Sequence, residues 1–178
     1  TAYELAKYDL KIKVLEKEHD VSNGTTKANS GIVHAGYDAP EGTLMAKYNA
    51  LGNAMYEELC KIIDAPFKRT GSLVLAFSEE EREHLTLLYN RGIKNGIPNM
   101  RIIEKEEVFA MEPNVSKEVV AALYAPTAGV TGPWEVTIKM LENAVLNGVE
   151  VVTDAKVEKI EKLAEGYRVI LANGEVLE

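Results

Sequence analysis

Apolar residues recur at the spacing of a helix along several stretches of the chain. Between positions 43 and 64 they fall three or four residues apart, at Leu44, Tyr48, Leu51, Met55, Leu59 and Ile62. Those steps predict one face of a helix, which Pro66 ends. Ser78 and Glu81 have the spacing of a capping box, so a second helix is predicted to begin there and to stop at Gly96.

Further helices follow from the same signals. A short helical segment is predicted near Glu104–Met111, where Pro113 halts it. A longer helix is predicted from Pro133, a residue favoured at the first helical position, to Gly148. The inward face of this helix is expected to consist of Trp134, Ile138, Leu141 and Val145.

Shorter apolar runs, bounded by glycine, proline and polar residues, predict strands. They lie at 11–16, 70–77, 119–125, 149–152 and 155–160. Near the end of the sequence, 167–171 and 175–177 flank Asn173-Gly174, the dipeptide typical of a type I′ turn. A β-hairpin is therefore expected there.

The order of these elements predicts an α/β fold. Residues 1–64 and 132–178 suit a doubly wound, Rossmann-like nucleotide-binding unit, whereas 65–131 suit an inserted α+β domain with its own antiparallel sheet. The residues from Thr1 to Tyr8 read as the last turns of a helix, and the sequence stops within a predicted strand. We therefore expect an internal fragment of a longer protein.

Composition narrows the classes of function. The 178 residues carry a formal net charge of −8, which argues against a nucleic-acid partner because such binding depends on clustered lysine and arginine. No apolar run approaches the length of a membrane span. With a single cysteine no disulfide framework is possible, and the three scattered histidines give no reason to expect a metal site. A cytoplasmic protein is expected.

An acidic residue ends the first predicted strand. In a dinucleotide-binding unit, an acid at the end of the second strand binds the adenosine ribose, about 20 residues after the first glycine of the phosphate-binding loop. Glu16 is a candidate for that acid, although the sequence contains no G-x-G-x-x-G motif. The alternative is that Glu16 is one more surface charge in the mixed run Glu16–Asp20.

A loop rich in glycine and hydroxyl residues follows, from Gly24 to Gly36. Such a loop can present donors to phosphate or to a flavin ring, although any polar loop contains similar groups. Its second part, Asn-Ser-Gly-Ile-Val-His-Ala-Gly from Asn29 to Gly36, closely resembles the flavin-contacting loop of L-2-hydroxyglutarate dehydrogenases. The preceding Leu-Glu-Lys-Glu and Gly-Thr-Thr resemble those enzymes and the flavin-linked glycerol-3-phosphate dehydrogenases, all members of the D-amino-acid-oxidase-like flavoproteins.

The resemblance spans effectively the whole chain. Phe67-Lys-Arg-Thr-Gly-Ser-Leu looks like the first strand of the substrate domain of that family, and further matching patterns begin at Asn95, Glu112, Ala125 and Pro133. The resemblance implies that 1–64 and 132–178 form part of an FAD-binding domain and that 65–131 form the substrate domain. The absent glycine loop is the departure from the family pattern.

The resemblance also implies roles for individual residues. Glu16 would bind the adenosine ribose of FAD, and Thr25 and Thr26 would lie near the pyrophosphate and ribityl chain. The backbone of Val157 would meet the adenine. The isoalloxazine would be lined by Asn29, Ser30, Gly31 and Ile32.

The family reaction removes hydride from the hydroxyl-bearing carbon of a small anionic substrate. Glycerol 3-phosphate is the expected substrate and L-2-hydroxyglutarate the alternative; a non-catalytic flavoprotein-like binding module is the alternative from another class. The hydroxyl proton needs a base with a pKa near neutrality, as imidazole has, so His34 is the candidate base unless it only hydrogen-bonds its loop. Lys68 and Arg69 are candidate cations for the substrate, or else solvated surface charges.

Three expectations concern the chain by itself. Residues 65–131 should fold, since they contain strands and capped helices, but FAD should not bind without the glycine loop. A sheet without its first strand exposes an edge, so a homodimer through that edge is expected.

Overall fold

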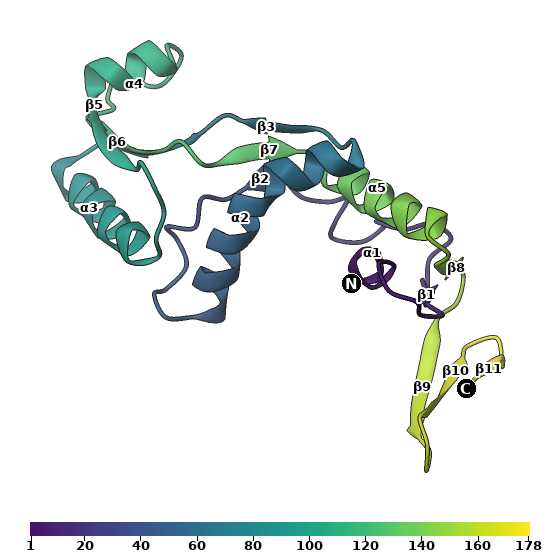
Figure 1. Cartoon of the computed structure of the whole chain (residues 1–178). Helices are drawn as coiled ribbons and strands as arrows, with labels where there is room; N and C mark the ends of the chain where they lie inside the picture. Colours follow the sequence, from purple (N-terminus) through teal and green to yellow (C-terminus); the bar gives the residue numbers. More distant parts are fainter. The chain divides into compact units, whose positions relative to one another are not determined.

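The computed structural model describes residues 1–178, which form two compact units (Figure 1). Unit 1 consists of Thr1–Ser30, Ile63–Ala65 and Pro133–Glu178, and unit 2 of Gly31–Ile62 and Pro66–Gly132. Helices occur together with several small sheets, most of them antiparallel, so the fold is mixed α/β. None of the helices is long and apolar enough to cross a membrane.

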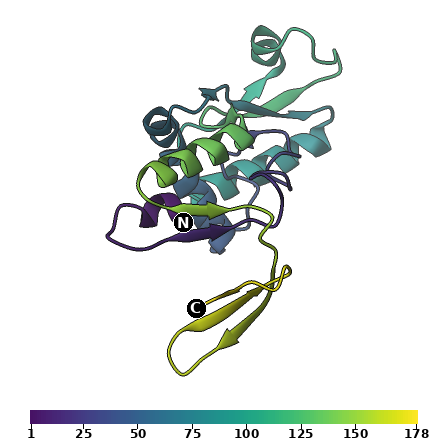
Figure 2. The same ribbon diagram turned by 90° about the vertical axis from the view of Figure 1, so that its right-hand side faces the viewer.

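Unit 1 is built around a short pair of parallel strands. Its elements are α1 (Ala2–Leu5), β1 (Lys13–Leu15), α5 (Pro133–Leu146), β8 (Glu150–Val152), β9 (Val157–Lys162), β10 (Tyr167–Leu171) and β11 (Val176–Leu177). β1 and β8 run parallel, with Val14 opposite Val151, and α5 leads directly into β8. β9, β10 and β11 form an antiparallel sheet, which Figure 2 shows from a second side.

Unit 2 contains two small antiparallel sheets. Its elements are β2 (Ile32–Val33), α2 (Leu44–Ile63, whose last residue is counted with unit 1), β3 (Phe67–Arg69), β4 (Ser72–Ala76), α3 (Glu79–Lys94), β5 (Arg101–Glu104), α4 (Lys105–Met111), β6 (Ala121–Ala125) and β7 (Gly129–Thr131). The strand order is β2-β7-β3 in one sheet and β4-β6-β5 in the other.

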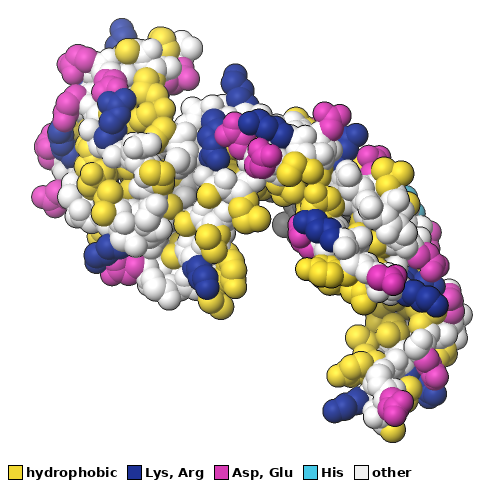
Figure 3. Space-filling model, in the orientation of Figure 1, with side chains coloured by type: hydrophobic (Ala, Val, Ile, Leu, Met, Phe, Trp, Pro, Cys, Tyr) yellow, Lys and Arg dark blue, Asp and Glu magenta, His cyan; other side chains and the backbone are white.

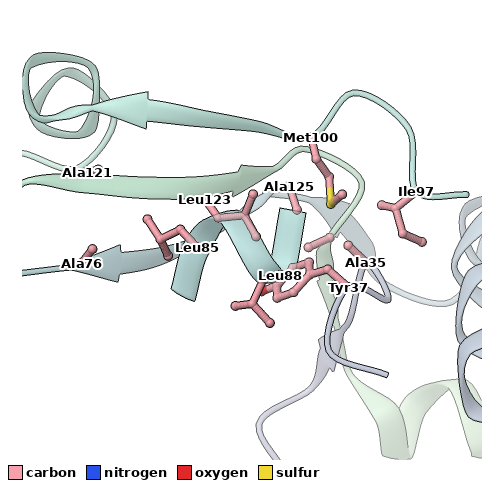
Figure 4. Close-up of a cluster of buried hydrophobic side chains, with 11 residues drawn as sticks. Ala35, Tyr37, Ala76, Leu85, Leu88, Ile97, Met100, Ala121, Leu123 and Ala125 are labelled. Atoms are coloured by element: carbon pink, nitrogen blue, oxygen red, sulfur yellow. The ribbon is translucent and has the colours of Figure 1, made fainter. Parts of the chain in front are cut away.

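The main core of unit 2 lies between α3 and the β4-β6-β5 sheet. Leu85 and Leu88 of α3 pack with Leu123 of β6 and with Tyr37, all of them buried (Figure 4). A smaller cluster, which includes Val108 of α4, contains alternate residues of the same sheet. Both faces of the sheet are therefore covered, which accounts for the continuous apolar sequence of β6.

The predicted strands and helices are found close to their expected positions, but the sheets differ in detail. The sequence pattern does not predict β5 or β7, since each is short and lies beside a helix start or a turn. The segment from Phe67 to Leu73 is not one strand. It divides at Gly71, whose φ of +71° interrupts the extended backbone, so β3 and β4 belong to different sheets.

The hairpin turn is a further correction. A type I′ turn requires positive φ at both central residues, but only Gly174 of the Asn173-Gly174 pair has it, with a φ of +88°. The Gly174 N–H donates to Leu171 O at 3.0 Å, while Ile170 pairs with Val176. The connection is thus a longer turn that ends in a left-handed glycine.

The predicted helices are present, but the residues that are buried are not those of the predicted apolar faces. In α5, Trp134 and Val145 are exposed, whereas Val136 and Ala144 are buried. In α2 the predicted apolar stripe is largely exposed, as the yellow side chains along that helix in Figure 3 indicate. Periodicity identifies an apolar face of a helix but not the element that covers it.

Candidate functional site

A cavity of about 520 Å³ in unit 1 lies at the carboxyl end of β1. Part of its wall comes from residues between Glu16 and Thr26. The rest comes from the N-terminal segment and from α5, by way of Thr137, Met140 and Leu141. In open α/β sheets, ligands bind outside the carboxyl ends of the strands, so this cavity is the candidate nucleotide site of unit 1.

Glu16 is fixed at this cavity by the parallel strand pair. Its N–H donates to Val152 O at 2.9 Å, and its carbonyl accepts from the Ala155 N–H at 2.8 Å. Oε1 of its carboxylate accepts from the Glu18 N–H at 2.9 Å, while Oε2 makes no hydrogen bond within the chain. That oxygen is available to a hydroxyl donor in the cavity.

The following loop is held largely by bonds within itself. Asn29 Nδ2 donates to Thr25 O at 3.0 Å and to Thr26 O at 2.8 Å. Thr26 lines the cavity, whereas Thr25, Asn29 and Ser30 are exposed and do not line it. Among the loop residues predicted to bind FAD, only Thr26 therefore shares the cavity with Glu16.

In unit 2, the residues around β2 alternate between two faces. Val33 is buried, and Ile32 before it is exposed. Across the β2-β7-β3 sheet, Ile32 lies opposite Val130, and Val130 lies opposite Lys68. Directly opposed residues of antiparallel strands point to the same face, so these three side chains form one exposed row.

His34 continues the exposed side of this segment two residues beyond Ile32, between buried neighbours. Its side chain is 58% exposed, and Nδ1 lies 3.9 Å from Oδ2 of Asp38. Its backbone is held more firmly than its ring. The His34 carbonyl accepts from Asn49 Nδ2 at 2.8 Å and from Asn53 Nδ2 at 2.9 Å, both on α2.

Arg69 points into the same hydrogen-bond network from β3. Its Nη1 donates to Asn53 Oδ1 at 2.9 Å and also to Thr127 O, and its Nη2 donates to Asn53 O at 2.9 Å. Its Nε lies 3.2 Å from Glu57 Oε2. The guanidinium is therefore bound to several protein groups, whereas Lys68, the other candidate cation, is exposed and makes no ion pair within the chain.

The candidates thus separate into two groups, one in each unit. Glu16 and Thr26 meet at the cavity of unit 1, and Ile32, His34 and Lys68 share an exposed side of unit 2. Gly31, buried with a φ of +67°, precedes β2, and its carbonyl accepts from the Thr131 N–H at 2.9 Å.

Val157 begins β9 and pairs with Leu171; it does not line the cavity of unit 1.

Sequence reasoning missed the asparagines of α2. Asn49, Asn53 and Glu57 recur every four residues and lie on the side of the helix that faces His34 and Arg69. Polar residues at helical spacing are usually taken for a solvated face, so the pattern gave no warning.

Two other titratable groups of unit 2 stay neutral near pH 7. Burial raises the pKa of the Tyr37 phenol, which packs in the main core, and a weaker effect of the nearby Ser72 hydroxyl opposes it. Burial also raises the pKa of the Cys60 thiol, which is 2% exposed. Neither group is a candidate base or nucleophile.

Comparison with known proteins gives consistent results. Residues 1–177 match the family described as FAD dependent oxidoreductase. The glycerol 3-phosphate dehydrogenase of Caloramator mitchellensis is 54% identical over 169 residues, which cover 95% of this chain and 35% of that protein. The human mitochondrial L-2-hydroxyglutarate dehydrogenase is 34% identical over 157 residues, 88% of this chain and 33% of that protein.

The fold of the chain also matches that of a solved protein structure with FAD bound. The dithionite-reduced L-alpha-glycerophosphate oxidase of Mycoplasma pneumoniae with FAD bound superposes with a TM-score of 0.89 at 35% identity, covering 97% of this chain and 46% of that one. The chain thus spans between a third and a half of the length of these relatives. The predicted cofactor, FAD, is that of the matched family. The chain belongs to the family of FAD-dependent oxidoreductases.

Proposed function

We propose that the native enzyme containing this chain is an FAD-dependent dehydrogenase that oxidises glycerol 3-phosphate. The observation that carries the proposal is the 54% identity to a glycerol 3-phosphate dehydrogenase over 95% of the chain. Identity to the human L-2-hydroxyglutarate dehydrogenase is 34% over 88%. The difference favours the phosphate ester over the dicarboxylate as substrate.

We further propose that unit 1 contributes part of a Rossmann-like FAD-binding domain and that residues 65–131 are an inserted substrate domain. The parallel pairing of β1 with β8 and the position of Glu16 support the first assignment. The antiparallel sheet β4-β6-β5, which lies wholly within these residues, supports the second. The boundaries stay predictions.

The residues at the cavity of unit 1 fit an adenosine ribose. Oε2 of Glu16 has a free lone pair at the end of a strand, where such an acid accepts from ribose hydroxyls. Thr26 and Gly24 line the same cavity, and no other heavy atom lies within 4 Å of a Cβ atom built at Gly24. Bound FAD would supply the two-electron acceptor for the reaction.

His34 would accept the proton of the substrate hydroxyl in this reaction. Its ring is exposed, so a substrate could reach it, and its Nδ1 lies 3.9 Å from the Asp38 carboxylate. Ile32, on the same side of the segment, would pack against the flavin ring, and Lys68 and Arg69 would attract the substrate phosphate.

The test is the rate of FAD reduction in the His34→Ala variant of the native enzyme, mixed with glycerol 3-phosphate in a stopped-flow instrument. Loss of a positioned base should slow reduction by about 10² to 10⁴-fold. His84→Ala is the matched control, because His84 is an exposed histidine on α3 whose side chain makes no ion pair or hydrogen bond in the chain.

Three results would contradict parts of the proposal. A reduction rate within a factor of two of wild type in His34→Ala would remove the base assignment. Faster reduction by L-2-hydroxyglutarate than by glycerol 3-phosphate would favour the alternative substrate. An FAD-loaded protein that neither substrate reduces would favour the non-catalytic binding module.

A further inference from the structure

Asn53 is the only polar or charged residue among those buried in the chain, with 6% of its surface exposed. Its carboxamide is fully bonded: Nδ2 donates to His34 O and to Thr127 O, both at 2.9 Å, and Oδ1 accepts from Arg69 Nη1. We call these four residues the Asn53 junction. A buried polar side chain is costly unless all of its hydrogen bonds are made, and here they are.

The junction joins segments that are distant in the sequence. Thr127 is 74 residues from Asn53, in the turn between β6 and β7, and His34 is 19 residues away, just after β2. Both contacts are to backbone carbonyls, which can only accept. Asn53 therefore has to present an amide nitrogen to both of them, and a carboxylate of the same size could not do so.

Arg69 fixes the orientation of this amide. A guanidinium only donates, so the atom of Asn53 that faces Nη1 must be the oxygen, and the nitrogen must then face the two carbonyls. Arg69 is held in turn by its second bond, from Nη2 to the Asn53 carbonyl, and by Glu57. The junction thus has one consistent arrangement of donors and acceptors.

The backbone is what orients the exposed ring of His34. The ring has only the 3.9 Å contact with Asp38, whereas its carbonyl is bonded to Asn53 and Asn49. A displacement of about 1 Å in a reacting group can lower a rate by 10²-fold. A fixed carbonyl next to the Cα of His34 restricts such displacements.

We propose that Asn53 is a positioning residue for His34, and that it acts by anchoring the His34 carbonyl to Arg69 and Thr127. The proposal rests on the proposed function, in which His34 is the base. It gives Arg69 a role in the junction besides the substrate contact proposed above. Asn53 touches neither substrate nor cofactor in this assignment.

The experiment measures single-turnover FAD reduction by saturating glycerol 3-phosphate in the FAD-loaded native enzyme. Asn53→Asp keeps the size of the side chain and an acceptor for Arg69, but it loses both donors. Reduction should slow by about 10- to 100-fold, with FAD content and the visible flavin spectrum unchanged. The matched control is Asn90→Asp, an exposed asparagine of α3, which should reduce FAD at the wild-type rate.

A second variant avoids the burial of a charge. Asn49→Asp removes the other donor to the His34 carbonyl from a residue at the rim of the network. It should fold even if Asn53→Asp does not, and it should slow reduction by a smaller factor, roughly threefold to tenfold. Wild-type reduction rates in both folded variants would overturn the proposal.

The decisive measurement repeats Asn53→Asp, and Asn49→Asp, in the His34→Ala background. If they act through His34, neither should slow the reaction further once the imidazole is gone. An equal slowing in both backgrounds would overturn the positioning role alone. A His34→Ala enzyme that reduces FAD at the wild-type rate would instead overturn the base assignment, and the positioning role with it.

Discussion

The loop that carries Thr26 in unit 1 is held by bonds within itself, whereas the segment that carries His34 in unit 2 is held by two helices. In unit 2, α2 contributes Asn53, and Asn95 at the end of α3 donates to Gly36 O at 3.0 Å and to Ala39 O at 2.8 Å. In unit 1, Asn29 Nδ2 donates to the carbonyls of Thr26 and Thr25, three and four residues before it.

The difference extends to the cores of the two units. Both hydrophobic clusters lie in unit 2, where Leu123 and Val108 are fully buried. In unit 1, α5 leaves Leu146 83% exposed. A segment packed on a complete core is organised before its ligand arrives, whereas an exposed loop gains order from the bonds that its ligand makes. We therefore expect unit 2 to present a preformed surface and unit 1 an adaptable one.

The largest effect should come from the core of unit 2. Leu123→Ala removes a fully buried side chain of β6, the strand between β4 and β5, and should lower the free energy of unfolding of unit 2 by about 2–5 kcal/mol. Leu146→Ala, the matched change at an exposed leucine of α5, should stay within about 0.5 kcal/mol. Hydrogen exchange of the β6 amides and of the β8 amides measures the two effects separately. If the two variants lowered the free energy of unfolding of their units equally, the contrast between the units would be contradicted.

A smaller effect is expected at the cavity of unit 1. Glu16→Ala in the native enzyme should weaken FAD binding by about 1–3 kcal/mol, the range for a hydrogen bond to a charged group. Isothermal titration with FAD measures it, and Glu165→Ala, an exposed acid in the turn after β9, is the control. FAD should also slow hydrogen exchange in residues 22–30 more than in 31–39. Unchanged affinity in Glu16→Ala would take this residue out of the ribose site.

Local sequence signals predicted most of the elements and part of the site. The capping pattern of Ser78, the proline at 133 and the turn at Gly174 each depend on residues that are close in sequence. Their positions can therefore be predicted without knowledge of tertiary contacts. The resemblance of the loop from Asn29 to Gly36 added the cofactor, and the family match agrees with it.

The features that the sequence could not predict depend on contacts between residues that are distant along the chain. β7 pairs closely with β3, since an added Cβ atom at Gly129 would stand 2.7 Å from Lys68 O and 2.8 Å from the Phe67 ring. The residues next to Gly129 in the sequence do not indicate that close approach. The Asn53 junction is hidden for the same reason, since its partners are up to 74 positions away.

The smallest effect concerns the start of α3, the helix that carries Asn95. Ser78 Oγ accepts from the Glu81 N–H at 3.2 Å, and Glu81 Oε2 accepts from the Phe77 N–H at 2.6 Å. Ser78→Ala should therefore destabilise the first turn of α3 by about 1 kcal/mol, seen as faster exchange of the Arg82 amide, which donates to Ser78 O.

Thr1→Ala is the matched control in unit 1, because Thr1 precedes α1 without a side-chain capping bond, and its replacement should leave exchange in α1 unchanged. In Ser78→Ala, exchange in residues 36–39 should also stay at the wild-type rate, since Asn95 holds that segment from the opposite end of the helix. Faster exchange there would mean that the two ends of α3 open together. The His34 segment would then depend on the whole helix for its order, rather than on the side chains that bond to it directly.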